Sequence, residues 1–371
     1  MAQWITAWGQ ALTDTAQLHP GKKLQTVRAI LPLGVSGSQI RLRFGNYAGK
    51  KPMHLSSITV QVGNSPILPV LFSGAESVSL PPYGDLYSDP IDLALHKGQD
   101  VTISIAAKGL FLSGNTPNEV VQISKPGNYA PCLQMPLARK SIRELLSPMG
   151  PVLPALTSVE VFTDEEASAI VCFGDSITRQ GHWTNPLRDM LFQAGHPVQL
   201  VNKGIGGNRL LRDALPGNPR YGQAGFTRFQ RDVLEQPGAS AVILALGTND
   251  LGFGDLDGSL KECNADHLAQ GFLELTNLAK SAGQKVYAAT VTPRCGSENW
   301  TEEKEIQRQK LNIWIRGADC FDDIMDFDFV TRDSQSPAML APACDSGDHL
   351  HPGPMGGKRM AREAFRVLTK T

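Results

Sequence analysis

The sequence lacks an excess of charge of either sign and any long apolar run. Lys and Arg total 35 and Asp and Glu total 36, so no basic surplus is present to bind a nucleic-acid backbone. No run of 18 apolar residues occurs, and we expect no membrane span. The N-terminus MAQWITAWGQALTDT has no basic segment followed by an apolar one, which predicts a cytoplasmic protein. The alternative is a secreted protein whose leader is missing from this sequence.

Cysteine is also scarce, and no two cysteines form a CxxC pair. The six are Cys132, Cys172, Cys263, Cys295, Cys320 and Cys344. Scattered cysteines without a secretion signal favour reduced thiols, with disulfide pairing as the alternative for a secreted chain. Hydrophobic residues make up 41% of the chain and charged residues 19%, which is typical of a folded protein. The length of 371 residues predicts two domains.

The first part of the chain, residues 1–155, has the pattern of an all-β domain. Apolar and polar residues alternate in Ile40–Phe44, Ile58–Val62 and Val101–Ile105. Such alternation gives a strand one buried face and one wet face, and short strands separated by turns predict an antiparallel sandwich or jelly roll. One short helix is expected near Arg139–Leu146. Prolines at positions 148, 151 and 154 then mark the predicted domain boundary.

From residue 156 onward, apolar runs alternate with longer helical patterns. The predicted strands are Ala169–Phe173, Val198–Val201, Ala241–Leu246, Val286–Val291 and Ile324–Phe327. The predicted helices are Trp183–Ala194, Phe226–Leu234, Asp266–Ala282, Glu302–Ala318 and Pro354–Leu368. This alternation predicts an α/β domain over 156–371, with a parallel sheet covered on both faces. Sites in such sheets lie beyond the carboxyl ends of the strands.

Three short polar motifs follow the first three of these strands. Phe173-Gly174-Asp175-Ser176 places a hydroxyl at a predicted helix start, where a nucleophile suits free N–H groups, although Ser176 could equally be a simple N-cap. The segment Asn202–Asn208 brings glycine N–H groups close to a ligand or forms an ordinary turn; it does not fit Gly-x-Gly-x-x-Gly. In Gly247–Asp250, the Asn249 amide can face an oxyanion or cap a turn.

A fourth motif, Asp348-His349-Leu350-His351-Pro352-Gly353, precedes the last predicted helix. His351 is a candidate general base and Asp348 can orient its ring, while His349 is a rival base and Asp345 a rival orienting residue. The alternative is a polar turn that only opens the helix. These residues are also metal-ligand types, but nothing marks further ligands, and we expect no metal and no cofactor. Together the four motifs supply a nucleophile, oxyanion donors and a base, as serine-hydrolase chemistry requires.

The four motifs resemble, in family order, the SGNH branch of the GDSL esterase/lipase family. The matching residues are Gly174-Asp175-Ser176, the Asn-x-x-Ile-x-Gly pattern of Asn202–Gly207, Gly247–Asp250, and the Asp-x-x-His pair of Asp348 and His351. The resemblance covers roughly residues 169–371 and implies a flavodoxin-like three-layer α/β/α fold. Ile177 stands where the family often has Leu.

Carried onto this sequence, the resemblance implies that Ser176 is the nucleophile, His351 the base and Asp348 its orienting partner. The N–H of Ser176, the N–H of Gly207 and the Asn249 side chain would form the oxyanion hole. Gly206 is the alternative glycine, because the double glycine leaves the register open by one.

The first part of the chain resembles the β-sandwich of a two-domain subset of bacterial GDSL hydrolases. The residues concerned are Trp4–Trp8, Thr26–Arg28 and Arg41–Asn46. From its sequence the protein is therefore predicted to be a serine esterase acting on short-chain acyl esters, with O-acetyl groups on carbohydrates as one class of substrate. The alternative within the family is a lipase, lysophospholipase or thioesterase that acts on longer acyl chains.

Three further residues are candidates for touching substrate. Trp300 is a sugar-stacking candidate after the fourth strand, with a partly buried loop aromatic as the alternative, and Arg209 and His182 fall near the same predicted face. Two other function classes are a binding protein with a lapsed active site and a phosphate- or flavin-binding module. All catalytic residue types are present, which disfavours a lapsed site. The sequence has no phosphate loop, and a phosphate- or flavin-binding module would leave the Ser, Asn and Asp-x-x-His set unexplained. The role of the β domain and the oligomeric state are not encoded in any recognisable pattern.

Overall fold

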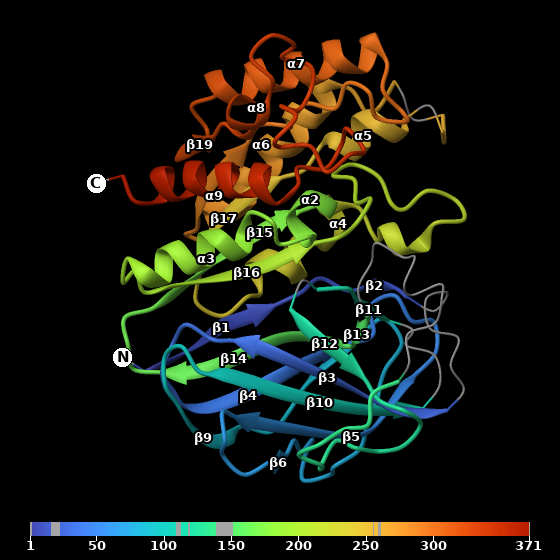
Figure 1. Cartoon of the computed structure of the whole chain (residues 1–371), viewed down its shortest axis with the longest axis vertical. Coiled ribbons are helices and arrows are strands. Elements are labelled where there is room, and N and C mark those ends of the chain that lie inside the picture. Colours follow the sequence, from blue (N-terminus) through green and yellow to red (C-terminus); the bar gives the residue numbers. More distant parts are fainter. Residues whose placement is uncertain are drawn as a thin grey trace. The chain divides into compact units, whose positions relative to one another are not determined.

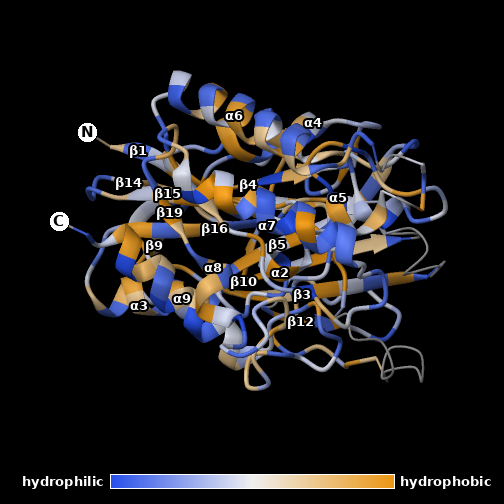
Figure 2. Ribbon diagram, turned by 90° about the horizontal axis from the view of Figure 1, so that it is seen from above, coloured by the Kyte–Doolittle hydropathy of each residue, from blue (hydrophilic) through white to orange (hydrophobic). Residues whose placement is uncertain are grey.

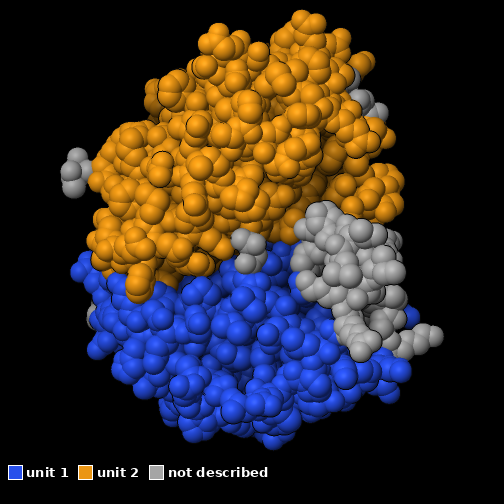
Figure 3. Space-filling model, viewed as in Figure 1, with its two compact units in different colours: residues 1–167 blue, residues 168–371 orange. Residues whose placement is uncertain are grey.

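A computed structural model describes residues 2–15, 23–108, 113–117, 119–138, 151–254, 256–258 and 261–370. The chain forms two compact units, residues 1–167 and 168–371, coloured separately in Figure 3. The division falls beyond the predicted boundary at residue 155. The reason is strand β14 (Leu156–Thr163), which pairs with β1 (Gln3–Gly9) on one side and β4 (Gly37–Gly45) on the other. This strand therefore belongs to the first unit.

The first unit consists of antiparallel sheets, which agrees with the predicted all-β class (Figure 1). One sheet has the order β1-β14-β4-β8, with β8 at Asp85–Tyr87 and with β9 (Ile91–Leu95) also paired to β4. A second has the order β12-β3-β10-β5-β6, with β7 also paired to β5. Its strands are β12 Val120–Ile123, β3 Leu24–Pro32, β10 Asp100–Lys108, β5 Met53–Val62, β6 Leu68–Pro69 and β7 Val78–Leu80. A small third sheet joins β13 (Leu153–Pro154), β11 (Ser113–Asn115) and β2 (Thr13–Asp14).

Alternation along these strands builds the core of the first unit. On β4 the side chains of Ile40, Leu42 and Phe44 are fully buried, Gln39 and Arg41 are partly exposed, and Arg43 is 8% exposed. Successive side chains of a strand point to opposite faces, and burial alternates at both ends of β5. The residues Ile103–Ala107 of β10 are instead buried on both faces. The predicted helix near Arg139–Leu146 lies outside the described residues.

The second unit is built on a parallel sheet with the order β16-β15-β17-β18-β19. The strands are β15 Ser168–Gly174, β16 Val198–Gly204, β17 Ala239–Ala245, β18 Lys285–Ala289 and β19 Asp323–Met325. Numbered along the chain, this is the order 2-1-3-4-5 of flavodoxin-like folds. The predicted fold class of this unit is thereby confirmed.

Helices cover both faces of this sheet (Figures 1 and 2). On one face α3 (Thr184–Gln193), α8 (Phe327–Thr331) and α9 (Pro354–Leu368) share one apolar core with the strands. On the other face α6 (Ala265–Ser281) packs on β17 and β18, and α7 (Glu302–Gly317) packs on α6. Figure 2 shows hydrophobic and hydrophilic residues alternating around α6, as expected of a helix with one face against a sheet.

Two predicted elements differ in detail. The expected helix at Phe226–Leu234 is an α-helix, α4 (Gly225–Phe229), continued by a π-helical turn, η2 (Gln230–Leu234). The expected strand at Ile324–Phe327 ends at Met325, because the Asp326 side chain accepts a hydrogen bond from the Phe329 N–H and caps α8. All six cysteines are free thiols. In the described part of the chain, no helix is both long and apolar enough to cross a membrane.

Candidate active site

Ser176 lies directly beyond the end of β15, at the first position of the short helix α2 (Ser176–Arg179). Asp175 holds the N-cap position, and its Oδ1 accepts a hydrogen bond from the Ile177 N–H at 2.9 Å. The simple capping role considered for Ser176 is therefore filled by its neighbour. Gly174 leaves no room for a side chain, since a Cβ there would lie 2.9 Å from the Ala245 carbonyl oxygen. The turn thus requires glycine before the Asp-Ser pair.

The second motif follows β16 and lies beside the first. The Ile205 N–H donates to the Gly174 carbonyl at 3.2 Å, and the Asn202 side chain donates to the Thr178 carbonyl at 2.8 Å. Gly207 adopts a φ of +75°, a left-handed conformation that disfavours residues with a Cβ. A Cβ there would also come within 2.5 Å of the aromatic ring of Tyr221, in the 3-10 turn η1 (Pro219–Tyr221).

The third motif brings the Asn249 side chain to the same edge of the sheet. Gly247, with a φ of +116°, ends the segment after β17, and α5 (Thr248–Phe253) begins immediately. Asn249 is only 4% exposed, and its Nδ2 donates to the Asn208 carbonyl at 2.9 Å. An amide nitrogen carries two hydrogens, so this contact leaves one donor for a second acceptor.

Asp250 fixes the segment that follows the second motif. Its two carboxylate oxygens accept the backbone N–H groups of Leu210 and Leu211 at 2.8 and 2.9 Å. Full burial raises the pKa of Asp250 to about 6, against the opposing effect of these hydrogen bonds. Asp175 is also fully buried, and its pKa is raised to about 7 by burial, with the charge of Asp250 adding to the shift. The first and third motifs therefore each contribute one fully buried carboxyl group, Asp175 and Asp250.

The loop before α9 brings His351 to Ser176. The Nε2 atom of His351 lies 2.8 Å from Ser176 Oγ, and its Nδ1 lies 2.6 Å from Asp348 Oδ2. The Asp348 Oδ1 accepts the backbone N–H groups of Leu350 and His351 and the hydroxyl of Ser346. With Nδ1–H donating to the carboxylate, Nε2 is left to accept the serine proton.

Asp348 stays ionised well into the acid range. Partial burial works to raise its pKa, but the hydrogen bonds from the His351 N–H and ring and from the Leu350 N–H outweigh it and lower the pKa to about 2. A carboxylate held in this state stabilises an imidazolium beside it. The arrangement is a hydroxyl, an imidazole and a carboxylate joined in series.

The rival pair forms its own contact. His349 Nδ1 lies 2.5 Å from Asp345 Oδ2, and Asp345 Oδ1 accepts the His349 and Gly347 N–H groups. These bonds hold His349 at a φ of +59°, which is rare for a residue with a side chain. Among the described residues, the histidine in hydrogen-bond contact with Ser176 is His351, not His349.

The three other substrate candidates have different surroundings. Arg209 is 3% exposed, and its guanidinium forms an ion pair with Asp257 at 2.7 Å. His182 is half-buried, and its Nδ1 lies 3.1 Å from the carbonyl of Pro352, next to His351. Trp300 is half-buried in the turn before α7. Of the three, His182 has a contact with a site loop, whereas Arg209 is engaged elsewhere.

Residues 172–359 match the model of the GDSL-like lipase/acylhydrolase family, a span just over half of the 371 residues. The chain belongs to this family. The predicted resemblance is confirmed, and with it the prediction of an ester-cleaving hydrolase. The serine, glycine, asparagine and histidine motifs all fall within the matched span. No curated protein matches the chain in sequence.

Solved structures similar to this member of the GDSL-like family include several hydrolases. A GDSL-like lipase from Bacteroides thetaiotaomicron is 20% identical, with a TM-score of 0.40 over 54% of this chain and 87% of its own. An acetylxylan esterase from Geobacillus stearothermophilus, a catalytic mutant, is 18% identical, with a TM-score of 0.42 over 55% and 96%.

Sequence reasoning missed one residue of the site. Arg228 on α4 is fully buried, and its guanidinium donates to the carbonyl oxygens of Gly174 and Lys203 at 2.9 and 2.8 Å. The available signal was the spacing of Arg228 and Asp232, which places two charges one turn apart on the same side of the chain as the buried Val233 and Phe229. Two opposite charges one turn apart on the apolar face of a helix indicate a buried ion pair.

Proposed function

We propose that this GDSL-like hydrolase is a serine esterase that cleaves short-chain acyl esters through an acyl-enzyme on Ser176. The observation that carries the proposal is the hydrogen-bonded series from Ser176 Oγ to His351 Nε2 and from His351 Nδ1 to Asp348, with distances of 2.8 and 2.6 Å. A serine hydroxyl is a weak nucleophile until an adjacent base takes its proton.

In the first half-reaction, Ser176 Oγ attacks the ester carbonyl carbon while its proton passes to His351 Nε2. The tetrahedral intermediate then expels the alcohol, which takes the proton back from His351. In the second half-reaction, water attacks the acyl carbon and gives a proton to the same nitrogen. The tetrahedral intermediate then breaks its bond to Ser176 Oγ, which takes that proton back from His351 as the carboxylic acid leaves. Asp348 holds the ring orientation and stabilises the imidazolium formed in each half-reaction.

The oxyanion would rest on three donors: the N–H of Ser176, the N–H of Gly207 and the Nδ2 of Asn249. In the described part of the chain, neither of the two backbone N–H groups has an acceptor. Gly206 remains the alternative to Gly207, because its N–H is equally without an acceptor there.

One donor of an oxyanion hole contributes about 100- to 1000-fold in kcat. We therefore expect Asn249→Ala to lower kcat by about that factor and to change KM little, as measured by steady-state hydrolysis.

The acylhydrolase family of this chain does not fix the length of the acyl group, and a short acyl group is the first hypothesis to test. O-acetyl groups on carbohydrates are the first natural class to examine. A lipase, lysophospholipase or thioesterase acting on longer chains is the alternative that the same chemistry would serve.

The test is hydrolysis of p-nitrophenyl esters from acetate to palmitate, with Ser176→Ala as the matched control. We expect activity at the acetate-to-butyrate end that the variant loses. A preference for laurate to palmitate would favour the lipase alternative. Hydrolysis by Ser176→Ala at the rate of the unaltered protein would contradict the proposed nucleophile.

A further inference from the structure

Arg228 joins backbone segments that are far apart in sequence. Its Nη2 donates to the Gly174 carbonyl, directly before the Asp175-Ser176 pair, at 2.9 Å. Its Nη1 donates to the Lys203 carbonyl near the end of β16 at 2.8 Å, and its Nε donates to Asn208 Oδ1 at 3.0 Å. Asn208 in turn accepts the Asn249 amide on its carbonyl oxygen at 2.9 Å. One guanidinium thus contacts, directly or through Asn208, the three segments that carry the proposed oxyanion donors.

The charge of Arg228 is kept in a site from which water is excluded. Burial lowers its pKa to about 10, with the negative charge of Asp232 opposing the shift, so the guanidinium stays charged at neutral pH. Asp232 Oδ2 lies 3.0 Å from Nη1, and the Phe173 ring lies under the guanidinium at 4.0 Å from its centroid. Burying a cation is costly unless it is paired and fully hydrogen-bonded. The free-energy cost of burying Arg228 is consistent with a residue whose hydrogen bonds hold neighbouring backbone segments in place.

We propose that Arg228 is a positioning residue for the oxyanion hole, a role that rests on the proposed serine-esterase function. It fixes the distance between the ends of β15 and β16, which carry the N–H groups of Ser176 and Gly207, and it fixes Asn249 through Asn208. An oxyanion hole acts because its donors are already in place when charge develops. Misplacement by about 1 Å can cost about 100-fold in rate.

Lysine cannot replace this arginine. The guanidinium sends N–H groups in several fixed directions within one plane, whereas an ammonium is a compact charge on a flexible stem. Arg228→Lys keeps the charge opposite Asp232 and cannot reach Gly174, Lys203 and Asn208 together. We expect it to lower kcat for p-nitrophenyl acetate by about 10- to 100-fold, with KM changed less than about threefold.

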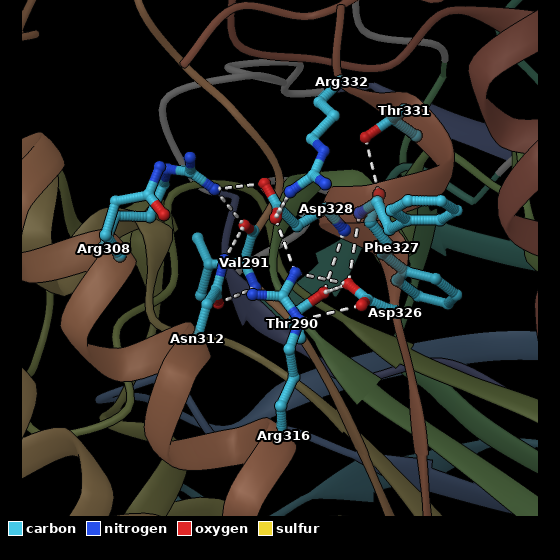
Figure 4. A network of polar contacts seen from close by, with 12 residues as sticks. Thr290, Val291, Arg308, Asn312, Arg316, Asp326, Phe327, Asp328, Thr331 and Arg332 are labelled. Carbon is cyan, nitrogen blue, oxygen red and sulfur yellow. Dashed lines mark hydrogen bonds and ion pairs between the residues drawn. The ribbon is translucent and has the colours of Figure 1, made fainter. Parts of the chain in front are cut away.

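The matched control is Arg308→Lys. Arg308 on α7 is equally buried and ion-paired, with Glu305 and Asp328, and it also donates to a backbone carbonyl, that of Val291 (Figure 4). It contacts none of the three donor segments. Loss of a buried, paired arginine should lower the melting temperature in both variants, and Arg308→Lys should keep kcat within about threefold. An equal loss of kcat in both variants would overturn the proposal.

A double-mutant cycle with Asn249→Ala supplies the readout that a merely structural role would not move. The effects of coupled residues on kcat are not additive. If Arg228 acts through the oxyanion donors, the factor by which Arg228→Lys lowers kcat is therefore at least about threefold smaller in the Asn249→Ala background than in the unaltered protein. Equal costs in the two backgrounds would overturn the proposal. Should Arg228→Lys fail to fold, Asn208→Ala decides instead. It removes the bond from Arg228 Nε, together with the Asn208 Nδ2 bonds to the carbonyls of Tyr221 and Gln223, and leaves Arg228 paired with Asp232. It must lower kcat with KM unchanged, and an unchanged kcat would overturn the proposal.

The esterase function and the positioning role fail separately. Turnover that survives in Ser176→Ala contradicts the serine-esterase function itself. Turnover that depends on Ser176 but is indifferent to both Arg228→Lys and Asn208→Ala contradicts the positioning role alone.

Discussion

At the residue scale, the loop before α9 poses a choice between two Asp–His pairs. Asp345 with His349 and Asp348 with His351 are similar in composition, spacing and contact distance, at 2.5 and 2.6 Å. Residue type and spacing alone do not decide between them, because in each pair the carboxylate lies within one turn of the imidazole. The resemblance to the family's Asp-x-x-His pattern favoured Asp348 and His351. The distinguishing fact is a contact between residues 175 positions apart, Ser176 Oγ with His351 Nε2.

This choice gives a prediction with a built-in control. Asp348→Asn should lower kcat by at least about 100-fold, because an amide cannot hold His351 in the required tautomer or stabilise its charged form. Asp345→Asn, the same change in the neighbouring pair, should keep kcat within about threefold. Both are measured by steady-state ester hydrolysis. The reverse order of effects would assign the base to His349.

Asp175 gives a prediction about stability and pH. Burial raises its pKa from an ordinary 3.8 to about 7, so between about pH 4 and pH 7 the folded protein holds a proton that the unfolded chain releases. Stability falls with rising pH wherever the folded state binds more protons. Asp175→Asn lacks this titration and keeps an acceptor for the Ile177 N–H.

The melting temperature of the unaltered protein, relative to that of Asp175→Asn, should therefore decrease as the pH rises from 4 to 7. Thermal unfolding followed by circular dichroism at several pH values measures it. A difference that stays constant across this range would show that the Asp175 carboxyl has its ordinary pKa.

At the scale of elements, the turn that carries Gly207 is fixed by conformation and by space together. Two glycines share a φ of +75°: Gly207, against the ring of Tyr221, and Gly195, where an added Cβ would have nothing within 4 Å. Replacement by alanine should cost each about 1 kcal/mol of backbone strain. Only Gly207→Ala adds a clash with an aromatic ring.

We therefore expect Gly207→Ala to lower the melting temperature more than Gly195→Ala, by at least about 2 °C. It should also lower kcat, since the Gly207 N–H is a proposed oxyanion donor, while Gly195→Ala should not. Calorimetry and ester hydrolysis measure the two effects. Equal melting temperatures would show that the Tyr221 ring moves aside freely, and equal rates would contradict the role of the Gly207 N–H as an oxyanion donor.

Most elements of the second unit could be predicted from the sequence, because their signals are local. The five apolar runs became the five strands of the sheet, and Pro354 opens the last helix at the expected place. The pairing of Arg228 with Asp232 left a signal in the sequence, but its contacts with the first and second motifs could not be predicted. Those partners are carbonyl oxygens 54 and 25 positions away, and a backbone acceptor leaves no trace in residue type. Contacts of this kind exist only once the strands are side by side.

At the scale of the whole molecule, strand β14 decides where the first unit ends. The predicted boundary at residue 155 followed the prolines, which mark turns, but the alternating strand after them pairs between β1 and β4. A domain cut at 155 loses a central strand of one sheet and exposes the edges of both neighbours, and it removes the buried Val159 and Val161 from the core.

Fragments test this boundary. We expect residues 1–167 to fold, with a cooperative thermal transition and a dispersed NMR spectrum, and residues 1–155 to lack both. The two fragments differ only by the segment that contains β14, so each serves as the other's control. Equal folding of the two would show that β14 is dispensable to the first unit.

The central claim about the molecule is that Ser176 is the nucleophile activated by His351. The most direct measurement is labelling with a fluorophosphonate, followed by mass spectrometry of the labelled peptide. We predict one phosphonylated residue, Ser176, and labelling that is abolished in Ser176→Ala and strongly slowed in His351→Ala. A label on a different residue, or full ester hydrolysis by a protein that takes no label, would contradict it.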